Sequence, residues 1–259
     1  MVRKLVSCFA AAAILTLPVC AQTVDEIIAK NIAARGGMEK LKAVKTMRMT
    51  GKMTVGPGIE APVTMEQKRP NSMRMEFTVQ GMTGVQAFDG TTGWMLMPFS
   101  GKKDPEPMTE EIAKEVAQQA DFDGPLVDYK EKGNQVELIG KESVEGTEAY
   151  KLKVTVKNGS VRYYYLDKDS FLEIKAESKR MVRGTEVEAE SVMGDYKEVQ
   201  GLMMPHSIEA GAKGRPEKQK VTIEKVEINP AIDDSRFKMP EVKKPEAKPE
   251  EKKPPEAKN

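Results

Sequence analysis

Residues 72–79 read SMRMEFTV, and this pattern recurs along most of the chain. Met73, Met75, Phe77 and Val79 occupy alternate positions, with polar side chains between them. Successive side chains of a strand point to opposite faces, so strict alternation predicts a half-buried antiparallel strand. The segment therefore decides the fold class: a sheet with one apolar face, which something apolar must cover.

The same alternation predicts about a dozen strands. Met47 and Met49 repeat it, and Leu172, Ile174 and Ala176 alternate with Glu173, Lys175 and Glu177 in the same way. The predicted strands lie near residues 45–55, 61–69, 72–79, 83–89, 93–97, 134–141, 147–157, 160–167, 171–180, 185–199, 203–210 and 218–228. Twist accumulates over so many strands, so one continuous sheet is expected to coil into a barrel or an open half-barrel, with charges outside.

The hairpin at Asn158-Gly159 has the strongest local turn motif, because Asn-Gly suits the two positive φ angles of a type I′ turn. A two-residue loop there places Val154 opposite Tyr163 and Leu152 opposite Tyr165. The prediction is that these side chains share the apolar face.

Helices are expected at two places. Thr23-Val24-Asp25-Glu26 forms a capping box, and Gly36-Gly37 provides a left-handed exit, followed by a short turn over residues 38–44. Thr109 is the expected N-cap of a second helix that ends near Asp121, with one shallow apolar face. This helix is the candidate lid over the sheet.

The two ends of the chain have distinct compositions. Residues 1–21 have a basic start, an apolar run and small residues before Gln22, which predicts a secretory signal peptide and export to the periplasm. In an alternative reading, Cys20 carries lipid and anchors the protein to a membrane. Residues 241–259 are almost wholly Lys, Glu, Pro and Ala, so we expect a disordered tail. The predicted single folded domain is 22–240.

Composition argues against several classes of function. The formal net charge of +1 does not suggest nucleic-acid binding. His206 is the only histidine, and both cysteines lie within the predicted leader, so we expect no metal site, no cofactor and no catalytic residues. Acidic pairs such as Asp121 and Asp123 are common in loops and assign no chemistry.

Methionine is concentrated on the first five predicted strands. Its side chain is flexible and polarizable, so it repacks against varied apolar ligands as readily as it fills an irregular core. Both readings remain open on the residues alone. If the apolar face holds a ligand, the candidate lining residues are Met47, Met49, Met73, Met75, Phe77, Trp94, Met95, Met97, Leu152, Val154 and Tyr163.

Three short motifs resemble one protein family. Lys68-Arg69-Pro70-Asn71 ends one predicted strand, residues 89–98 read DGTTGWMLMP, and residues 232–240 read IDDSRFKMP. Together they resemble the LolA-like family of bacterial outer-membrane lipoprotein-sorting carriers (LolA/LolB/LppX-type), the last of them matching its closing strand. The resemblance covers roughly residues 24–240.

The resemblance implies an open, strongly curved antiparallel half-barrel, mainly β, with a few helices covering the concave face. It also implies a non-enzymatic carrier or chaperone that shields acyl chains of a lipid or lipoprotein between membranes, with a membrane-associated donor or acceptor protein as a further partner. Arg69 matches the family arginine whose hydrogen bonds hold the lid closed. The alternative is an envelope binding or regulatory module of the same fold that contacts a protein partner or the cell wall.

Overall fold

The computed structural model describes residues 22–56, 58–182 and 184–241. The predicted signal peptide, Cys20 and all but the first residue of the predicted tail lie outside the described residues. The helices are α1 (Val24–Ala34), α2 (Met38–Ala43) and α3 (Glu110–Gln119), with short 3-10 turns η1 (Pro98–Ser100) and η2 (Asp234–Arg236). The strands are β1 (Thr46–Gly56), β2 (Ile59–Lys68), β3 (Ser72–Val79), β4 (Met82–Phe88), β5 (Gly93–Leu96), β6 (Glu106–Pro107), β7 (Gln135–Val144), β8 (Thr147–Thr155), β9 (Val161–Asp167), β10 (Glu173–Val182), β11 (Thr185–Val199), β12 (Leu202–Ala212) and β13 (Lys218–Ile228).

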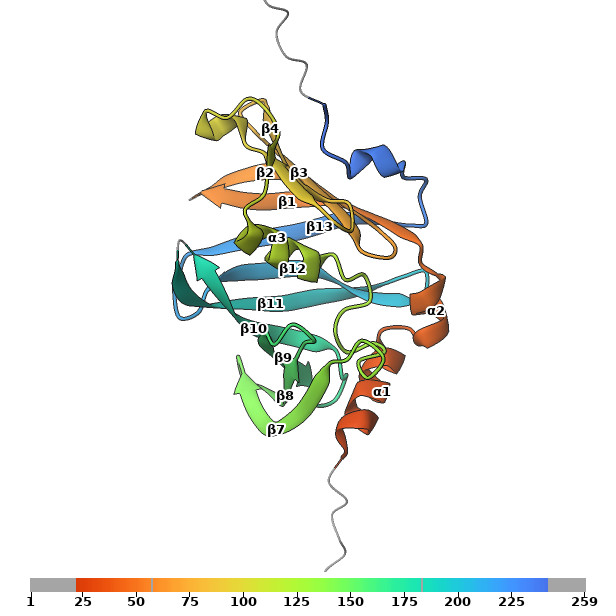
Figure 1. Ribbon diagram of the computed structural model, residues 1–259. Coiled ribbons are helices and arrows are strands. Elements are labelled where there is room, and N and C mark those ends of the chain that lie inside the picture. The colour runs from red at the N-terminus through yellow and green to blue at the C-terminus, as the bar shows by residue number, and fades with distance from the viewer. Residues whose placement is uncertain (1–21, 57, 183, 242–259) are drawn as a thin grey trace, which may run out of the picture.

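All of these strands belong to one antiparallel sheet, in the order β6-β5-β4-β3-β2-β1-β13-β12-β11-β10-β9-β8-β7. Each strand pairs with its neighbour in sequence, except that β13 returns beside β1 and that β6 and β7 are the two free edges. The chain must therefore pass from one edge to the other between β6 and β7. It does so through α3 and a loop of residues 120–134, the crossing loop, and Figure 1 shows α3 in front of the curved sheet. The predicted open half-barrel is confirmed.

Local sequence explains how the helices begin and end. The Thr23 side chain accepts a hydrogen bond from the Glu26 backbone N–H, and the Glu26 carboxylate accepts one from the Thr23 backbone N–H, so the predicted capping box is present at α1. Gly36 and Gly37 have φ of 120° and 89°, and Gly37 N–H donates to the Ile32 carbonyl, which ends the helix. Thr109 caps α3 as predicted.

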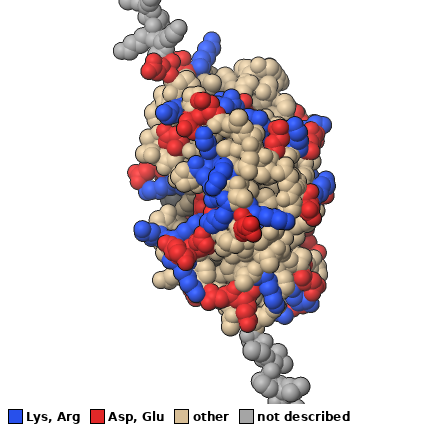
Figure 2. Space-filling model, turned by 90° about the vertical axis from the view of Figure 1, so that its right-hand side faces the viewer, with Lys and Arg blue, Asp and Glu red and all other residues tan. Residues whose placement is uncertain are grey.

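The sheet uses its two faces differently. The concave face carries apolar clusters under the helices: α1 packs on β8 and β9, and α3 packs on β3, β4 and β5. The convex face carries charged side chains and smaller apolar clusters, and Figure 2 shows Lys and Arg interspersed with Asp and Glu on one side of the molecule. The alternation predicted this division, because each strand exposes its polar set on the outside.

Residues 229–241, the C-terminal segment, form no strand. They cross the convex face instead: Lys68 Nζ donates to the Ile232 carbonyl at 2.9 Å, and Trp94 Nε1 donates to the Phe237 carbonyl at 2.8 Å. Phe237 and Trp94 are both buried as a result. The expected closing strand was therefore wrong, and the segment serves as an outer strap over the first strands.

The β8–β9 hairpin is shifted by one residue from the prediction. Val154 pairs with Arg162, and Leu152 pairs with Tyr164. Gly159 N–H donates to the Val156 carbonyl, and only Gly159 of the turn has a positive φ, so the loop has three residues and not two. A shift of one residue exchanges the two faces of a strand, so Tyr163 and Tyr165 lie opposite to the face that was predicted.

A β-bulge changes the direction of side chains at the start of β10. The register shifts between Glu173, which faces Leu166, and Lys175, which faces Tyr165. A bulge places an extra residue on one strand and re-aims the neighbouring side chains. Ile174 packs on the convex side with Tyr165, whereas Glu173 lines the cavity on the concave side. The predicted regular alternation of residues 172–177 is therefore wrong at this point.

Candidate functional site: a cavity beneath a helical lid

A cavity of about 270 Å³ lies between the concave face of the sheet and the elements that cover it. Its sheet wall comes from β1, β9, β10, β11 and β12, and its cover comes from α1, α2 and the crossing loop. Most of its lining is apolar, with four methionines among its sheet residues. The lining residues used below are Asn31, Arg35, Met47, Phe122, Asp123, Leu126, Tyr164, Glu173, Met193, Tyr196, Met203 and Met204.

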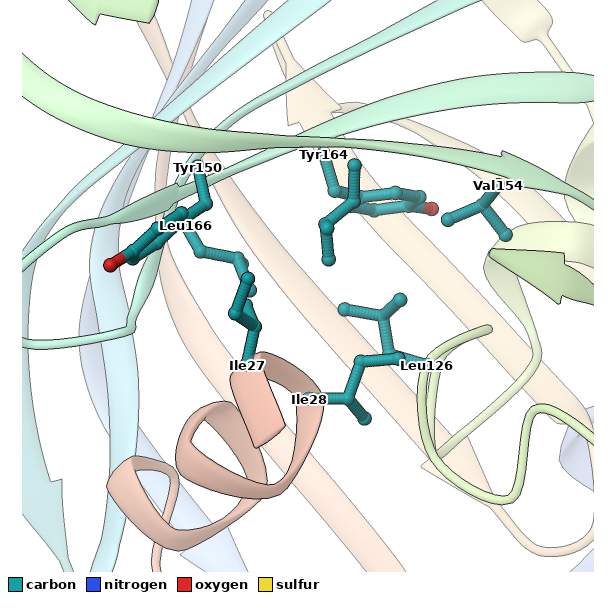
Figure 3. Close-up of a cluster of buried hydrophobic side chains, with 8 residues drawn as sticks. Ile27, Ile28, Leu126, Tyr150, Val154, Tyr164 and Leu166 are labelled. Atoms are coloured by element: carbon teal, nitrogen blue, oxygen red, sulfur yellow. The ribbon is translucent and has the colours of Figure 1, made fainter. Parts of the chain in front are cut away.

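Helix α1 covers one end of this face. Ile27 and Ile28 point from the helix toward Tyr164 and Leu166 of the sheet, and Leu126 of the crossing loop joins the same cluster (Figure 3). Ile27 and Leu166 are fully buried. Burying such a side chain contributes about 1.5–3 kcal/mol, so this contact anchors α1 firmly to the sheet.

Helix α3 covers another part of the same face more lightly. Val116 and Ala120 are its buried contacts, and they pack with Met73, Phe88 and Met108. The remaining apolar side chains of the helix are small or only partly buried, and a second opening of about 280 Å³ separates its end from the β8–β9 hairpin. A contact built from alanines buries little area, so α3 can separate from the sheet at lower cost than α1.

Arg69, between β2 and β3, ties the cover to the sheet. Its Nη1 donates to Asp123 Oδ2 at 2.8 Å and its Nη2 to Asp123 Oδ1 at 2.5 Å. Its remaining hydrogen bonds go to the carbonyls of Leu41, at 2.9 Å, and Val44, at 2.6 Å, near the end of α2. The guanidinium also lies 4.7 Å from the ring centroid of Phe122. One side chain thus joins the sheet, α2 and the crossing loop, and we call the Arg69–Asp123 pair the latch.

The electrostatics of the latch favour the closed arrangement. Burial alone would raise the pKa of the Asp123 carboxyl, but hydrogen bonds from Arg69 and Lys42 outweigh burial and lower that pKa to about 2. The side chain of Asp123 is 8% exposed, and that of Arg69 is 20% exposed. A bidentate pair with so little solvent is stronger than a surface ion pair, so it holds the crossing loop against α2.

The structure brings several of the predicted lining residues to the concave face. Met47 lines the cavity, and Met49 packs beside Phe122. The others occupy three neighbouring environments: Met73 and Met95 beneath α3, Met75 and Phe77 with Met53 and Val63, and Leu152 and Val154 beneath α1. Met97 directly follows β5 and caps η1.

Two of the predicted lining residues lie on the convex face. Trp94 pairs with Ala87, packs with it on the outside and is covered by Phe237 of the C-terminal segment. It cannot share a face with Met95, its neighbour in the strand. Tyr163 pairs with Lys153 because of the shifted hairpin, and its ring lies under the ammonium group of Lys151. Both side chains are therefore outside the candidate site.

Sequence reasoning missed the residues that complete the site. Asp123 was treated as one of many loop carboxylates, although it is the acceptor for Arg69. The one feature of the sequence that pointed to Asp123 as this acceptor is its position directly after Phe122, at the end of the predicted lid helix. Met203 and Met204 are adjacent in β12 and needed the β1–β13–β12 pairing to be placed beside Met47. No local pattern marked Glu173, because the bulge that turns it inward was not foreseen.

Potential metal ligands are scattered among the described residues. Nowhere in them do three or more His, Cys, Asp or Glu side chains gather as a metal ion would need. Among the helices that the structure describes, none has the length and apolar character required to cross a membrane. His206 is buried and its Nδ1 lies 3.0 Å from the Met204 carbonyl.

No family model and no curated protein match this sequence. Solved structures share its fold. A DUF1329 family protein from Desulfovibrio piger has 12% sequence identity and a TM-score of 0.59, over 83% of this chain and 97% of that one. A LolA superfamily protein from Nitrosomonas europaea has 16% identity and a TM-score of 0.55, over 84% of this chain and 98% of that one. An outer membrane lipoprotein-sorting protein domain from Vibrio parahaemolyticus has 10% identity and a TM-score of 0.52, over 82% and 94%.

The sheet, its helical cover and the cavity between them define a class of protein: an open antiparallel half-barrel with a latched lid. The solved structures identify this architecture as the LolA-like fold. At identities of 10–16% the likeness establishes the fold alone.

Proposed function

We propose that the protein is an exported, non-enzymatic carrier that shields the acyl chains of a lipid or lipoprotein while they cross the periplasm toward the outer membrane. The observation that carries the proposal is the methionine-lined cavity beneath a cover whose crossing loop is tied to the sheet by the latch. The LolA-like fold and the predicted leader support it. So does the likeness in fold to the outer membrane lipoprotein-sorting protein domain from Vibrio parahaemolyticus.

The physical need for such a carrier is large. Each CH₂ group taken out of water contributes about 0.8 kcal/mol, so a chain of about sixteen carbons costs about 12 kcal/mol to expose. Free diffusion of that chain through an aqueous compartment is negligible. A carrier must cover the chain and still release it, which requires a cover held by a few separable contacts.

The closed cavity is smaller than the ligand it would take. Ligand pockets usually measure about 300–1,000 Å³, and the cavity, at about 270 Å³, lies just below this range. The flexible side chains of Met47 and Met204, which pack in one apolar cluster, change shape at low cost, and the crossing loop moves once the latch opens. Entry of an acyl chain is therefore coupled to movement of the crossing loop away from the sheet.

Native mass spectrometry of the protein purified from its own secretion pathway tests the proposal. We expect the mature protein to carry acyl lipid, and the delipidated protein to bind cis-parinaric acid with 1:1 stoichiometry. Ligand-free protein that also fails to bind the fatty acid would refute the carrier function. The same spectrum reports whether the N-terminus is acylated.

Substitution within the cavity localises the binding. Met193→Gln keeps the side-chain size but places an amide against the chain, which costs about 1–3 kcal/mol, so we expect about tenfold weaker binding of cis-parinaric acid. Met82→Gln is the matched control, because Met82 is 39% exposed on β4 and is not part of the cavity lining. If the two variants bind cis-parinaric acid equally tightly, the cavity is not the binding site. The alternative, a regulatory module, predicts instead that a protein partner is captured and that no acyl chain binds.

A further inference from the structure

Two polar residues of the cavity lining, Asn31 of α1 and Glu173 of β10, take no part in the latch. Both offer acceptor oxygens beside the methionines that suit a hydrocarbon chain. Buried acceptors without donors cost free energy, so their presence in a binding cavity calls for a ligand group that satisfies them.

Asn31 is 1% exposed, and its two amide atoms differ in their bonding. Its Nδ2 donates to the Phe171 carbonyl at 2.7 Å, which fixes the orientation of the amide. Within the described part of the chain, its Oδ1 is buried and has no hydrogen-bond partner. The side chain is therefore held with an acceptor that lacks a donor.

Glu173 reaches the cavity only because of the β-bulge at the start of β10. Without the bulge its side chain would join Lys175 and Glu177 on the convex face, where those two form an ion pair at 2.8 Å. Bulges that re-aim a side chain occur often beside functional sites. The backbone at this point is also fixed, because the Tyr196 hydroxyl donates to the Glu173 carbonyl.

The protein leaves the Glu173 carboxyl without a strong neutralising partner. Burial raises its pKa to about 7, although the charges of Arg35 and Arg162 lower it. Both arginines direct hydrogen bonds elsewhere: Arg35 Nη1 donates to the Asp123 carbonyl at 3.3 Å, and Arg162 donates to the Gln118 side chain. The carboxyl is thus desolvated inside the cavity and available to a ligand.

We propose that Glu173 and Asn31 form the polar end of the cavity and select an uncharged lipid that carries hydrogen-bond donors, hydroxyl or amide N–H, next to its acyl chain. This inference rests on the proposed carrier function and names the chemistry of its cargo. Two acceptors match two donor protons of one head group, while the methionine wall holds the chain. A lipid ester without donors would leave both acceptors unsatisfied, which a site of this kind penalises.

Two probes with the same acyl chain test the selection. Monoolein has two hydroxyl donors, and methyl oleate has none. Each displaces cis-parinaric acid from the delipidated protein at pH 8, where the Glu173 carboxyl is ionised and acts only as an acceptor. We expect the protein to bind monoolein about tenfold more tightly than methyl oleate, since water in the opened cavity reduces the full discrimination.

Substitution of Glu173 assigns the selection to this residue. In Glu173→Met we expect the preference to fall to within about threefold, through weaker binding of monoolein and stronger binding of methyl oleate. Glu188→Met is the control, because Glu188 is exposed on the convex side of the neighbouring strand β11 and should keep the tenfold preference. Circular dichroism of each variant verifies folding.

The outcomes separate this inference from the carrier function. Equal binding of both probes by the unsubstituted protein overturns the inference and leaves the carrier function intact. A preference that persists in Glu173→Met also overturns it, because the selection would then come from elsewhere. Failure of cis-parinaric acid, monoolein and methyl oleate all to bind refutes the carrier function, because a single charged probe could be excluded by the Glu173 carboxylate alone.

Discussion

Asp123→Asn isolates the latch. The substitution keeps the size of the side chain and one acceptor oxygen, but it removes the charge that pairs with Arg69 and Lys42. The pKa of Asp123 is about 2 against an ordinary 3.8, which corresponds to roughly 2 kcal/mol of stabilisation of the folded state by the ionised carboxyl. Since the amide retains one hydrogen bond, we expect the free energy of unfolding to fall by about 2 kcal/mol.

The crossing loop should respond to Asp123→Asn more strongly than the rest of the molecule. A loss of about 2 kcal/mol that acts on the closed state raises the open population about 30-fold. We therefore expect amide hydrogen exchange in residues 121–127 to accelerate by about that factor and cis-parinaric acid to enter faster in stopped-flow mixing. Exchange in β8 and β9 should change only as far as global stability changes.

Asp121→Asn is the matched control in the same loop. Asp121 pairs with Lys132, at 2.7 Å, so this ion pair lies within the crossing loop and does not join it to the sheet. Its loss should cost less than about 1 kcal/mol and leave the uptake rate nearly unchanged. If both variants open the lid equally, or if exchange in residues 121–127 is unaffected by Asp123→Asn, the latch does not hold the cover.

Three further predictions concern stability. The pKa of Glu173 is raised in the folded state, so the folded form binds more protons than the unfolded form between about pH 4.5 and 7. Stability should therefore fall by roughly 3 kcal/mol as pH rises through this window, and urea unfolding of Glu173→Gln should lack the decline. Gly51→Ala would place a Cβ 1.9 Å from a backbone oxygen of β13, so we expect a loss of at least 2 kcal/mol in urea unfolding, whereas Gly194→Ala, which meets nothing within 4 Å, should change stability by less than about 1 kcal/mol. Phe237→Ala should cost about 3–5 kcal/mol and shift the fluorescence of Trp94, the only tryptophan, to longer wavelength as the strap loosens; an unshifted spectrum would contradict the packing of the strap on that ring.

Which side chains lie on each face of the sheet depended on features that alternation in the sequence does not encode. Trp94 and Met95 are both apolar neighbours in β5, and only the packing of the C-terminal segment decides that Trp94 faces outward. The one-residue shift at Gly159 and the bulge at Glu173 also change the face on which side chains lie. Each is a small local irregularity whose effect on the faces extends along the strand.

What the sequence determined by itself was local. Alternation placed most of the strands, Thr23 and Thr109 marked the helix starts, and Arg69 stood out by its motif, because extended chain, helix caps and turns depend on residues within a few positions of each other. The tertiary structure alone decided which carboxylate Arg69 binds, which strands meet around the cavity, and that Glu173 faces into it. Those relations join residues far apart in the chain, and their energies exist only once the sheet has curved and the crossing loop has closed over it.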